Sequence, residues 1–217
     1  IGNVFEGPNF ESCEDAIRLA HGDAGVLCLY GNYGGDRMNF NMACEFLEAE
    51  GIATRTVLGT DDIASAAPDE AHKRRGVAGI LYAYKAAGAL AENGASLEEV
   101  ARIAQKAVDA TRTIGIALSP CRVPTANTPN FAIAPDEIEM GMGIHGEPGI
   151  WRAKLKTADA IADEMLERLL ADRPIASGSR VSVAIGPMNA TGSRTTTRTP
   201  SGVFVSSSGA VTAAKPS

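Results

Sequence analysis

Hydrophobic positions along the chain alternate between short continuous runs and longer segments with helical spacing. Residues 24–30 (AGVLCLY) form an unbroken apolar run, which is typical of a buried parallel strand. Residues 38–51 follow with apolar positions at helical spacing, and the predicted helix stops at Gly51. Residues 52–58 (IATRTVL) alternate and predict the next strand. This order of elements indicates an α/β fold.

Two helices are predicted in succession after these elements. Residues 74–94 are mostly apolar with small side chains, which suits a helix packed flat on a sheet. Ser96 and Glu99 form a capping box that opens another helix, running to about Ala110. Because no strand separates the two helices, we expect a domain boundary near residues 108–113.

The second half repeats the pattern of strands and helices. Strands are predicted at residues 113–120, 136–144 and 179–186, an amphipathic helix at 156–174, and a proline-containing loop at 121–131.

The character of the sequence changes after Gly186. The remaining residues are rich in Ser, Thr and Ala with little apolar periodicity, so we expect a linker-like or poorly packed tail at 187–217. Within it, residues 202–207 (GVFVSS) could add one edge strand. The predicted division is therefore 1–110, 111–186 and the tail.

Composition narrows the class of protein. The 217 residues are 45% hydrophobic and 21% charged with 23 glycines, as in a soluble α/β protein, and no apolar run is long enough to cross a membrane. The net charge of −6 argues against nucleic acid or an anionic membrane as a partner. Four cysteines without metal-ligand spacing indicate reduced, buried thiols and a cytoplasmic protein.

One histidine stands in unusual surroundings. His145 is one of three histidines in the chain and lies within GMGIHGEPGI (residues 141–150), which holds four glycines. Glu147 could hold or polarise the imidazole, and Pro148 stiffens the turn. A neutral imidazole is both a nucleophile and a base, so His145 is a candidate catalytic residue. The alternative is a turn histidine without a function.

A second candidate site is GNYGGD (residues 31–36), between a predicted buried strand and a helix. Ligands of open α/β sheets bind at this carboxyl end of the strands. Gly34 and Gly35 allow close approach of the backbone, and Asp36 falls at the positive end of the helix dipole. An ordinary helix cap is the alternative. The motif is neither GxGxxG nor a P-loop, so no common nucleotide site is present.

Other polar residues are given structural roles. His21 and His72 are expected to be solvated, as is the charged cluster at residues 73–75. Asp61 and Asp62 are interpreted as a polar loop rather than a metal pair, and no metal site is expected.

Several separate motifs, in the same order, resemble the dihydroxyacetone kinases, specifically their dihydroxyacetone-binding subunit or domain. The resemblance covers roughly residues 1–186 and is strongest at residues 143–149. The motifs are GNVFEGP (2–8), NYGGDRMNF (32–40), RRGVAG (74–79), ASLEEV (95–100), TRTIGIALSPCRVP (111–124) and GIHGEPG (143–149).

The resemblance implies two α/β domains, each a mixed sheet flanked by helices, with the substrate site between them and a homodimeric assembly. Residues 1–110 would be the C-terminal part of the first domain and 111–186 the N-terminal part of the second, followed by a divergent tail. The family's upstream segment with another substrate-contacting histidine would be missing, so this fragment alone is expected to be inactive.

The resemblance also implies a chemistry. The family histidine that corresponds to His145 attacks the ketone of dihydroxyacetone and forms a covalent hemiaminal, which excludes polyols such as glycerol. Asp36 would bind a terminal hydroxyl and accept its proton as the phosphoryl group arrives. Residues expected to line the substrate are Gly34, Gly35, Gly146 and Glu147.

The implied activity is that of a glycerone (dihydroxyacetone) kinase component in glycerol metabolism. The chain itself would bind no cofactor, and phosphate would come from ATP with Mg or from a phosphotransferase system, through a nucleotide-binding kinase domain or other partner. Gly31 stands where the family has lysine, which makes a tetrulose such as erythrulose a possible substrate. Further alternatives are a non-catalytic ketose-binding regulator and an unrelated sugar-binding domain.

Overall fold

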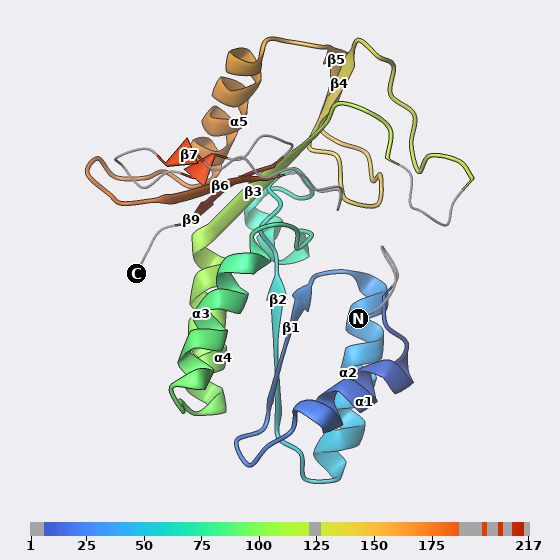
Figure 1. The fold of residues 1–217 in the computed structure, drawn as a ribbon, viewed down its shortest axis with the longest axis vertical. Helices are drawn as coiled ribbons and strands as arrows, with labels where there is room; N and C mark the ends of the chain where they lie inside the picture. The colour runs from blue at the N-terminus through green and yellow to red at the C-terminus, as the bar shows by residue number, and fades with distance from the viewer. Residues whose placement is uncertain (1–6, 122–126, 187–196, 199–203, 206–209, 215–217) are drawn as a thin grey trace.

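The computed structural model describes residues 7–121, 127–186, 197–198, 204–205 and 210–214. Two α/β halves are stacked along the long axis of the molecule (Figure 1). The predicted α/β class is confirmed. Residues 1–6, with most of the GNVFEGP motif, and residues 122–126 of the predicted loop lie outside the described residues.

The first half is built on two parallel strands, which pair from Val26–Thr54 to Gly31–Gly59. Helices α1 and α2 cover one face of this pair, and α3 and α4 cover the other (Figure 1). The elements are α1 (Phe10–Ala20), β1 (Val26–Gly31), α2 (Gly34–Ala49), β2 (Thr54–Gly59), the 3₁₀ helix η1 (Pro68–Lys73), α3 (Ile80–Glu92) and α4 (Leu97–Ala110).

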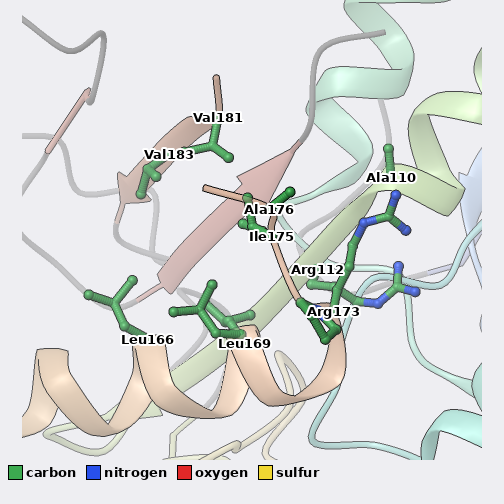
Figure 2. Close-up of a pocket in the computed structure, with 11 residues that line it drawn as sticks. Ala110, Arg112, Leu166, Leu169, Arg173, Ile175, Ala176, Val181 and Val183 are labelled. Atoms are coloured by element: carbon green, nitrogen blue, oxygen red, sulfur yellow. The ribbon is translucent and has the colours of Figure 1, made fainter. Parts of the chain in front are cut away.

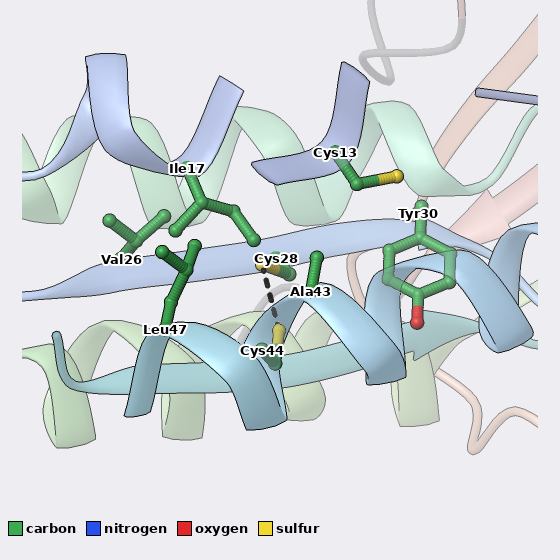
Figure 3. Close-up of a cluster of buried hydrophobic side chains, with 8 residues drawn as sticks. All are labelled: Cys13, Ile17, Val26, Cys28, Tyr30, Ala43, Cys44 and Leu47. Carbon is green, nitrogen blue, oxygen red and sulfur yellow. Dashed lines mark hydrogen bonds between the residues drawn. The ribbon is translucent and has the colours of Figure 1, made fainter. Parts of the chain in front are cut away.

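Helix α1 was not predicted, although its sequence carries a start signal. The side chain of Asn9 accepts a hydrogen bond from Ser12 N at 2.9 Å and so caps the helix. Cys13 and Ile17 are buried on the face that packs against α2 and β1, where Figure 3 shows them beside Cys28 and Cys44.

The thiols of this cluster are buried. Cys28 and Cys44 form no disulfide, and their thiols share a hydrogen bond with 3.7 Å between the Sγ atoms (Figure 3). Burial raises the pKa of Cys13 to about 11, so this thiol stays protonated at neutral pH. Three of the four cysteines therefore fit the expectation of buried thiols, while Cys121 is half-buried.

Helix α3 begins at Ile80 rather than at residue 74. Residues 74–79 instead cross the ends of β1 and β2, where a Cβ on Gly76 would lie 2.6 Å from the Cα of Gly31. The expected solvation of the cluster at 73–75 is wrong for Arg74, which is 1% exposed. Its guanidinium pairs with Asp172 of the second half, at 2.9 Å between Nη1 and Oδ2.

The second half is a five-stranded sheet in the order β5-β4-β3-β9-β6, with antiparallel neighbours throughout. Helix α5 packs on it through Met165 and Leu169, which contact Ile114 and Met140. The elements are β3 (Thr111–Ala117), β4 (Glu137–Met140), β5 (Trp151–Lys154), α5 (Ala158–Asp172), β6 (Ser182–Gly186) and β9 (Ala210–Ala214), with a separate pair β7 (Thr197–Arg198) and β8 (Phe204–Val205).

Two predictions about this half need correction. Strand β5 was missed, and residues 210–214 of the tail form β9 between β3 and β6 rather than a linker. The Ala- and Thr-rich sequence of β9 carries no strand pattern of its own. Only its pairing with β3 and β6 identifies it as a strand. Strand β8 falls inside the predicted segment 202–207; the flanking residues of that segment lie outside the described ones.

The two halves are joined without a loop, because α4 ends at Ala110 and β3 begins at Thr111. Asp61 adds a buried connection: its carboxylate accepts from the Thr113 hydroxyl at 2.7 Å and from Gly79 N at 2.9 Å. An isolated parallel bridge joins Asp62 to Thr113. The predicted division into domains at residue 110 stays a prediction. Of the helices within the described residues, none is long and apolar enough to cross a membrane.

Candidate functional site

The loop between β4 and β5 carries His145. Gly141 and Gly146 have φ values of +81° and +88°, which favour glycine, and they turn the chain sharply on either side of the histidine. Within the loop, Gly146 N donates to Gly143 O at 3.1 Å, and Gly143 N donates to Glu147 O at 3.0 Å. The glycines that surround His145 therefore build a compact, hydrogen-bonded loop.

Glu147 holds His145 at two points. Its Oε1 lies 2.9 Å from Nδ1 of the imidazole, and its Oε2 accepts from the backbone N–H of His145 at 3.0 Å. Burial raises the pKa of Glu147, but the hydrogen bonds from His145 and the loop backbone outweigh it and leave that pKa below its ordinary value. An ionised carboxylate only accepts, so in a neutral imidazole the proton sits on Nδ1 and the lone pair on Nε2.

Tyr33 brings the first half of the chain to this histidine. Its ring lies 4.9 Å from the His145 ring, centroid to centroid, at 89°. Tyr33 occupies the N-cap position of α2, directly before the two glycines of the NYGGD motif. Its hydroxyl is buried and has no hydrogen-bond partner within the part of the chain that the structure describes. The predicted motifs at residues 31–36 and 143–149 thus meet in space.

Asp36 lies in the first turn of α2 and is half-buried. Burial raises the pKa of Asp36, and a positive charge on His145 would oppose that rise. Gly7 packs against this carboxylate, because a Cβ on Gly7 would lie 2.8 Å from Oδ1. Asp36 therefore lies about one helical turn beyond Tyr33, whose ring contacts His145.

The other predicted lining residues differ in their surroundings. Gly34 and Gly35 are exposed, and a Cβ on either would meet no atom within 4 Å, so open space adjoins the start of α2. A Cβ on Gly146, in contrast, would lie 3.1 Å from Phe131. At Gly31 it would lie 2.9 Å from Gly76 O and 3.0 Å from the Tyr33 ring.

Arg75 and Asp62 reach the same site and were not predicted to do so. Arg75 donates from Nε to Asp62 Oδ2 at 2.9 Å, and its Nη1 lies 3.6 Å from Glu147 Oε2. Asp62 is 2% exposed, and burial raises its pKa against the pull of Arg75. Arg75 and Asp62 were missed because charged residues of a loop were assumed to be solvated. Arg75 nevertheless lies in RRGVAG, one of the motifs that the sequence analysis singled out.

No group of three or more His, Cys, Asp or Glu within the described ranges could hold a metal ion. A cavity of about 200 Å³ lies between α5 and β6, in the second half (Figure 2). It is lined by Leu166, Leu169, Ile175, Val181 and Val183 with two arginines, and it includes none of the predicted site residues.

The α/β fold thus holds a carboxylate-supported histidine in its second half, and the ring of this histidine contacts Tyr33 of the first half. The chain belongs to the Dak1 domain family, whose model matches residues 1–199. The resemblance found in the sequence is thereby confirmed. The match runs past Gly186, which corrects the expectation that the likeness ends there.

Curated relatives of two kinds are similar to the chain. The D-erythrulose kinase of Mycolicibacterium smegmatis is 42% identical over 191 residues, which is 88% of this chain and 33% of that protein. The dihydroxyacetone-binding subunit of PTS-dependent dihydroxyacetone kinase 1 from Listeria innocua is 40% identical over 190 residues, 88% of this chain and 58% of that subunit. The chain thus spans between a third and three fifths of the length of these relatives.

Solved structures share the fold over nearly the whole chain. The dihydroxyacetone kinase of C. freundii superposes with a TM-score of 0.81 at 30% identity, over 99% of this chain and 42% of that one. The dihydroxyacetone kinase operon co-activator Dha-DhaQ gives a TM-score of 0.83 at 26% identity, over 99% of this chain and 73% of that one.

Proposed function

We propose that the chain is the ketose-holding component of a kinase that phosphorylates dihydroxyacetone or a similar short-chain ketose. The observation that carries this proposal is the 2.9 Å contact between His145 Nδ1 and Glu147 Oε1, which directs the lone pair to Nε2. The position of Asp36, about one helical turn beyond the Tyr33 ring that contacts His145, supports it. Gly34, Gly35, Gly146 and Glu147 would surround the ketose.

The first step is capture of the ketone. Nε2 of His145 adds to the carbonyl carbon, so a C–N bond forms and the C=O π bond becomes a hydroxyl. The Nδ1 proton passes to Glu147 as the ring becomes positive, and the new alkoxide takes a proton from solvent, which leaves a neutral hemiaminal. Glycerol has no carbonyl and cannot be captured, so the chemistry itself selects ketoses.

The second step is phosphorylation of the terminal hydroxyl. Asp36 accepts the hydroxyl proton while the oxygen attacks the arriving phosphoryl group. The phosphate would come from ATP with Mg or from a phosphotransferase system, carried by a nucleotide-binding kinase domain or other partner. Because the matched relatives are longer, the donor and the rest of the active site belong to the intact protein, and this stretch alone would be inactive. We further propose that the protein is a homodimer, that it lies in the cytoplasm, and that it serves glycerol metabolism.

A specific observation favours a second substrate, erythrulose. Gly31 replaces the lysine of the family motif, and Gly31 packs within contact distance of Tyr33 and Gly76 instead of projecting a cation. An erythrulose kinase stands among the similar proteins. A regulatory ketose-binding protein is the other candidate, since a co-activator shares the fold. Asp36 favours the kinase, because capture of a ketose alone needs no base for phosphoryl transfer.

Native mass spectrometry of the intact protein tests the proposal. Wild type, His145→Ala and the matched control His21→Ala, at an exposed histidine after α1, are each incubated with dihydroxyacetone, erythrulose or glycerol. We expect a ketose adduct that survives gas-phase activation in wild type and in the control and is absent from His145→Ala. Glycerol is never retained, and the better-retained ketose identifies the substrate. A wild type that retains no ketose contradicts covalent capture.

A further inference from the structure

Arg75 belongs to the first half of the chain but faces the histidine loop of the second. Its guanidinium contacts Asp62 Oδ2 from Nη2 at 2.8 Å, donates to the Gly141 carbonyl at 3.2 Å, and places Nη1 3.6 Å from Glu147 Oε2. The side chain is 13% exposed, so solvent screens these interactions little. One arginine thus contacts both the backbone at the start of the loop and the carboxylate that bonds to His145.

Gly143 provides the space in which Arg75 and Glu147 meet. A Cβ at this position would collide with Glu147 Oε2 and with Arg75 Nη1. Gly143 has no positive φ, so its backbone conformation does not by itself require glycine. The absence of a side chain at residue 143 is therefore needed for the contact between the two charged groups.

We propose that Arg75 is a positioning residue that fixes Glu147, and through it keeps the His145 proton on Nδ1 and the lone pair on Nε2. The inference rests on the proposed function, because Nε2 is the atom assigned to ketose capture. Without Arg75, only the two hydrogen bonds with His145 orient the Glu147 carboxylate. A less firmly held carboxylate lets a neutral imidazole distribute its proton over both nitrogens. The fraction with hydrogen on Nε2 cannot attack a carbonyl through that atom.

The geometry requires arginine rather than any cation. Asp62, Gly141 and Glu147 lie in three directions around one planar guanidinium, whose five N–H groups form a rigid fork. A lysine ammonium at residue 75 could keep the charge opposite the buried Asp62, but it could not reach all three partners. Arg75→Lys therefore keeps the positive charge opposite Asp62, which folding needs, but loses the contact that positions Glu147.

The test uses the intact protein labelled with ¹⁵N-histidine, in wild type, Arg75→Lys and Gly143→Ala. Arg112→Lys is the matched control, because Arg112 pairs with Asp172 at 2.7 Å and lies outside the histidine site. Loss of the signal in His145→Ala assigns the His145 resonances. The ring ¹⁵N shifts are read without ketose, and the rate of ketose capture is followed by native mass spectrometry.

We expect one tautomer, with the proton on Nδ1, in wild type and in Arg112→Lys. Arg75→Lys and Gly143→Ala should give a mixture and capture ketose about 10- to 100-fold more slowly. Folded variants that keep the wild-type tautomer, or that change it without slowing capture, overturn the role of Arg75. If wild type captures no ketose, the proposed function fails, while the ¹⁵N shifts still decide whether Arg75 controls the tautomer.

Discussion

Arg74 and Asp172 lie 98 positions apart in the sequence and form a paired contact in the interior, with 2.9 Å between Nη1 and Oδ2. Arg74 is 1% exposed, and its Nε also donates to the Ala66 carbonyl at 2.9 Å. Asp172 accepts in addition from Arg112 at 2.7 Å. A single carboxylate thus compensates two arginines, one of which has no access to solvent.

Asp172→Asn should strongly destabilise the protein. The substitution keeps the shape of the side chain but leaves Arg74 buried without a counter-charge, which costs about 3–5 kcal/mol in the free energy of unfolding. Urea unfolding measures the loss as a lower midpoint with an unchanged slope. Glu14→Gln, at the exposed ion pair with Arg18, serves as control and should leave the midpoint unchanged. Equal midpoints for Asp172→Asn and wild type would contradict the role of this pair.

The same carboxylate predicts a pH dependence. Burial raises the pKa of Asp172, but the hydrogen bonds from Arg74 and Arg112 outweigh this effect. The pKa of Asp172 in the folded protein therefore lies below the unfolded value of about 3.9. Its contribution to stability is therefore present above that value and is lost as the pH falls through the folded pKa. The stability difference between wild type and Asp172→Asn should narrow on acidification below about pH 4, as measured by urea unfolding at a series of pH values.

Asp36→Asn should separate ketose capture from phosphorylation. The adduct on His145 should persist, whereas phosphoryl transfer in the intact protein with its donor should fall about 10²- to 10⁴-fold with the loss of the general base. Product formation and native mass spectrometry measure the two steps. Retained phosphorylation in Asp36→Asn would remove Asp36 from the catalytic assignment.

The rate of phosphorylation should also report the burial of Asp36. Only the ionised carboxylate accepts a proton, and burial raises the pKa of Asp36. The wild-type rate should therefore fall on acidification at a pH above about 3.9, the ordinary value for aspartate. A pH profile of the intact protein gives the pH at which the rate falls. A rate that stays unchanged down to about pH 4 would contradict the prediction.

Gly31 should influence the choice of ketose. A side chain at residue 31 forces Tyr33 or Gly76 to move, and Tyr33 packs on the ring of His145. Gly31→Lys should lower the preference for erythrulose over dihydroxyacetone by about 10-fold, in the range that one methylene is worth in a pocket. Gly31→Ala adds a Cβ without a charge, so it separates the effect of lost space from the effect of the added cation. The ratio of kcat/KM values for the two ketoses is the measurement, and an unchanged ratio in both variants removes Gly31 from substrate selection.

Thiol labelling should distinguish Cys121 from the other cysteines. Cys13, Cys28 and Cys44 are buried between α1, β1 and α2, whereas Cys121 is half-buried. In the native protein, iodoacetamide should modify Cys121 more than about 10-fold faster than the other three, because reaction requires an accessible thiolate. Peptide mass spectrometry gives the rates, and equal labelling of all four would show that the cluster opens in solution.

Local signals predicted much of the fold. The capping box at Ser96 predicted α4, where the Ser96 hydroxyl accepts from Glu99 N at 3.3 Å, and the apolar run at 24–30 predicted β1. Strand β9 and the loop at 74–79 were not predicted, because their structure depends on partners far away in the sequence. The mostly apolar, small-residue composition of residues 74–94 predicted a helix from residue 74, whereas Arg74 is buried against Asp172 and α3 begins only at Ile80.

The candidate site divides in the same way. His145, Glu147 and Asp36 could be named as candidates because each lies in a short motif whose residue types already indicate chemistry. Arg75 and Asp62 were not named, because their role exists only where a segment of the first half meets the histidine loop. Charge alone predicts exposure, and only the structure shows that these two residues are exceptions.

The separation of Arg74 from Asp172 also bears on synthesis of the chain. When residues up to 110 have left the ribosome, the sequence of β1, β2 and their helices is complete. Asp172, the ion-pair partner of Arg74, has not yet been translated. A bare guanidinium cannot enter a nonpolar interior, so the stretch from Asp61 to Gly79 stays hydrated until α5 emerges. The segment that faces the His145 loop therefore reaches its final arrangement late, after about 60 residues beyond Ala110 have been translated.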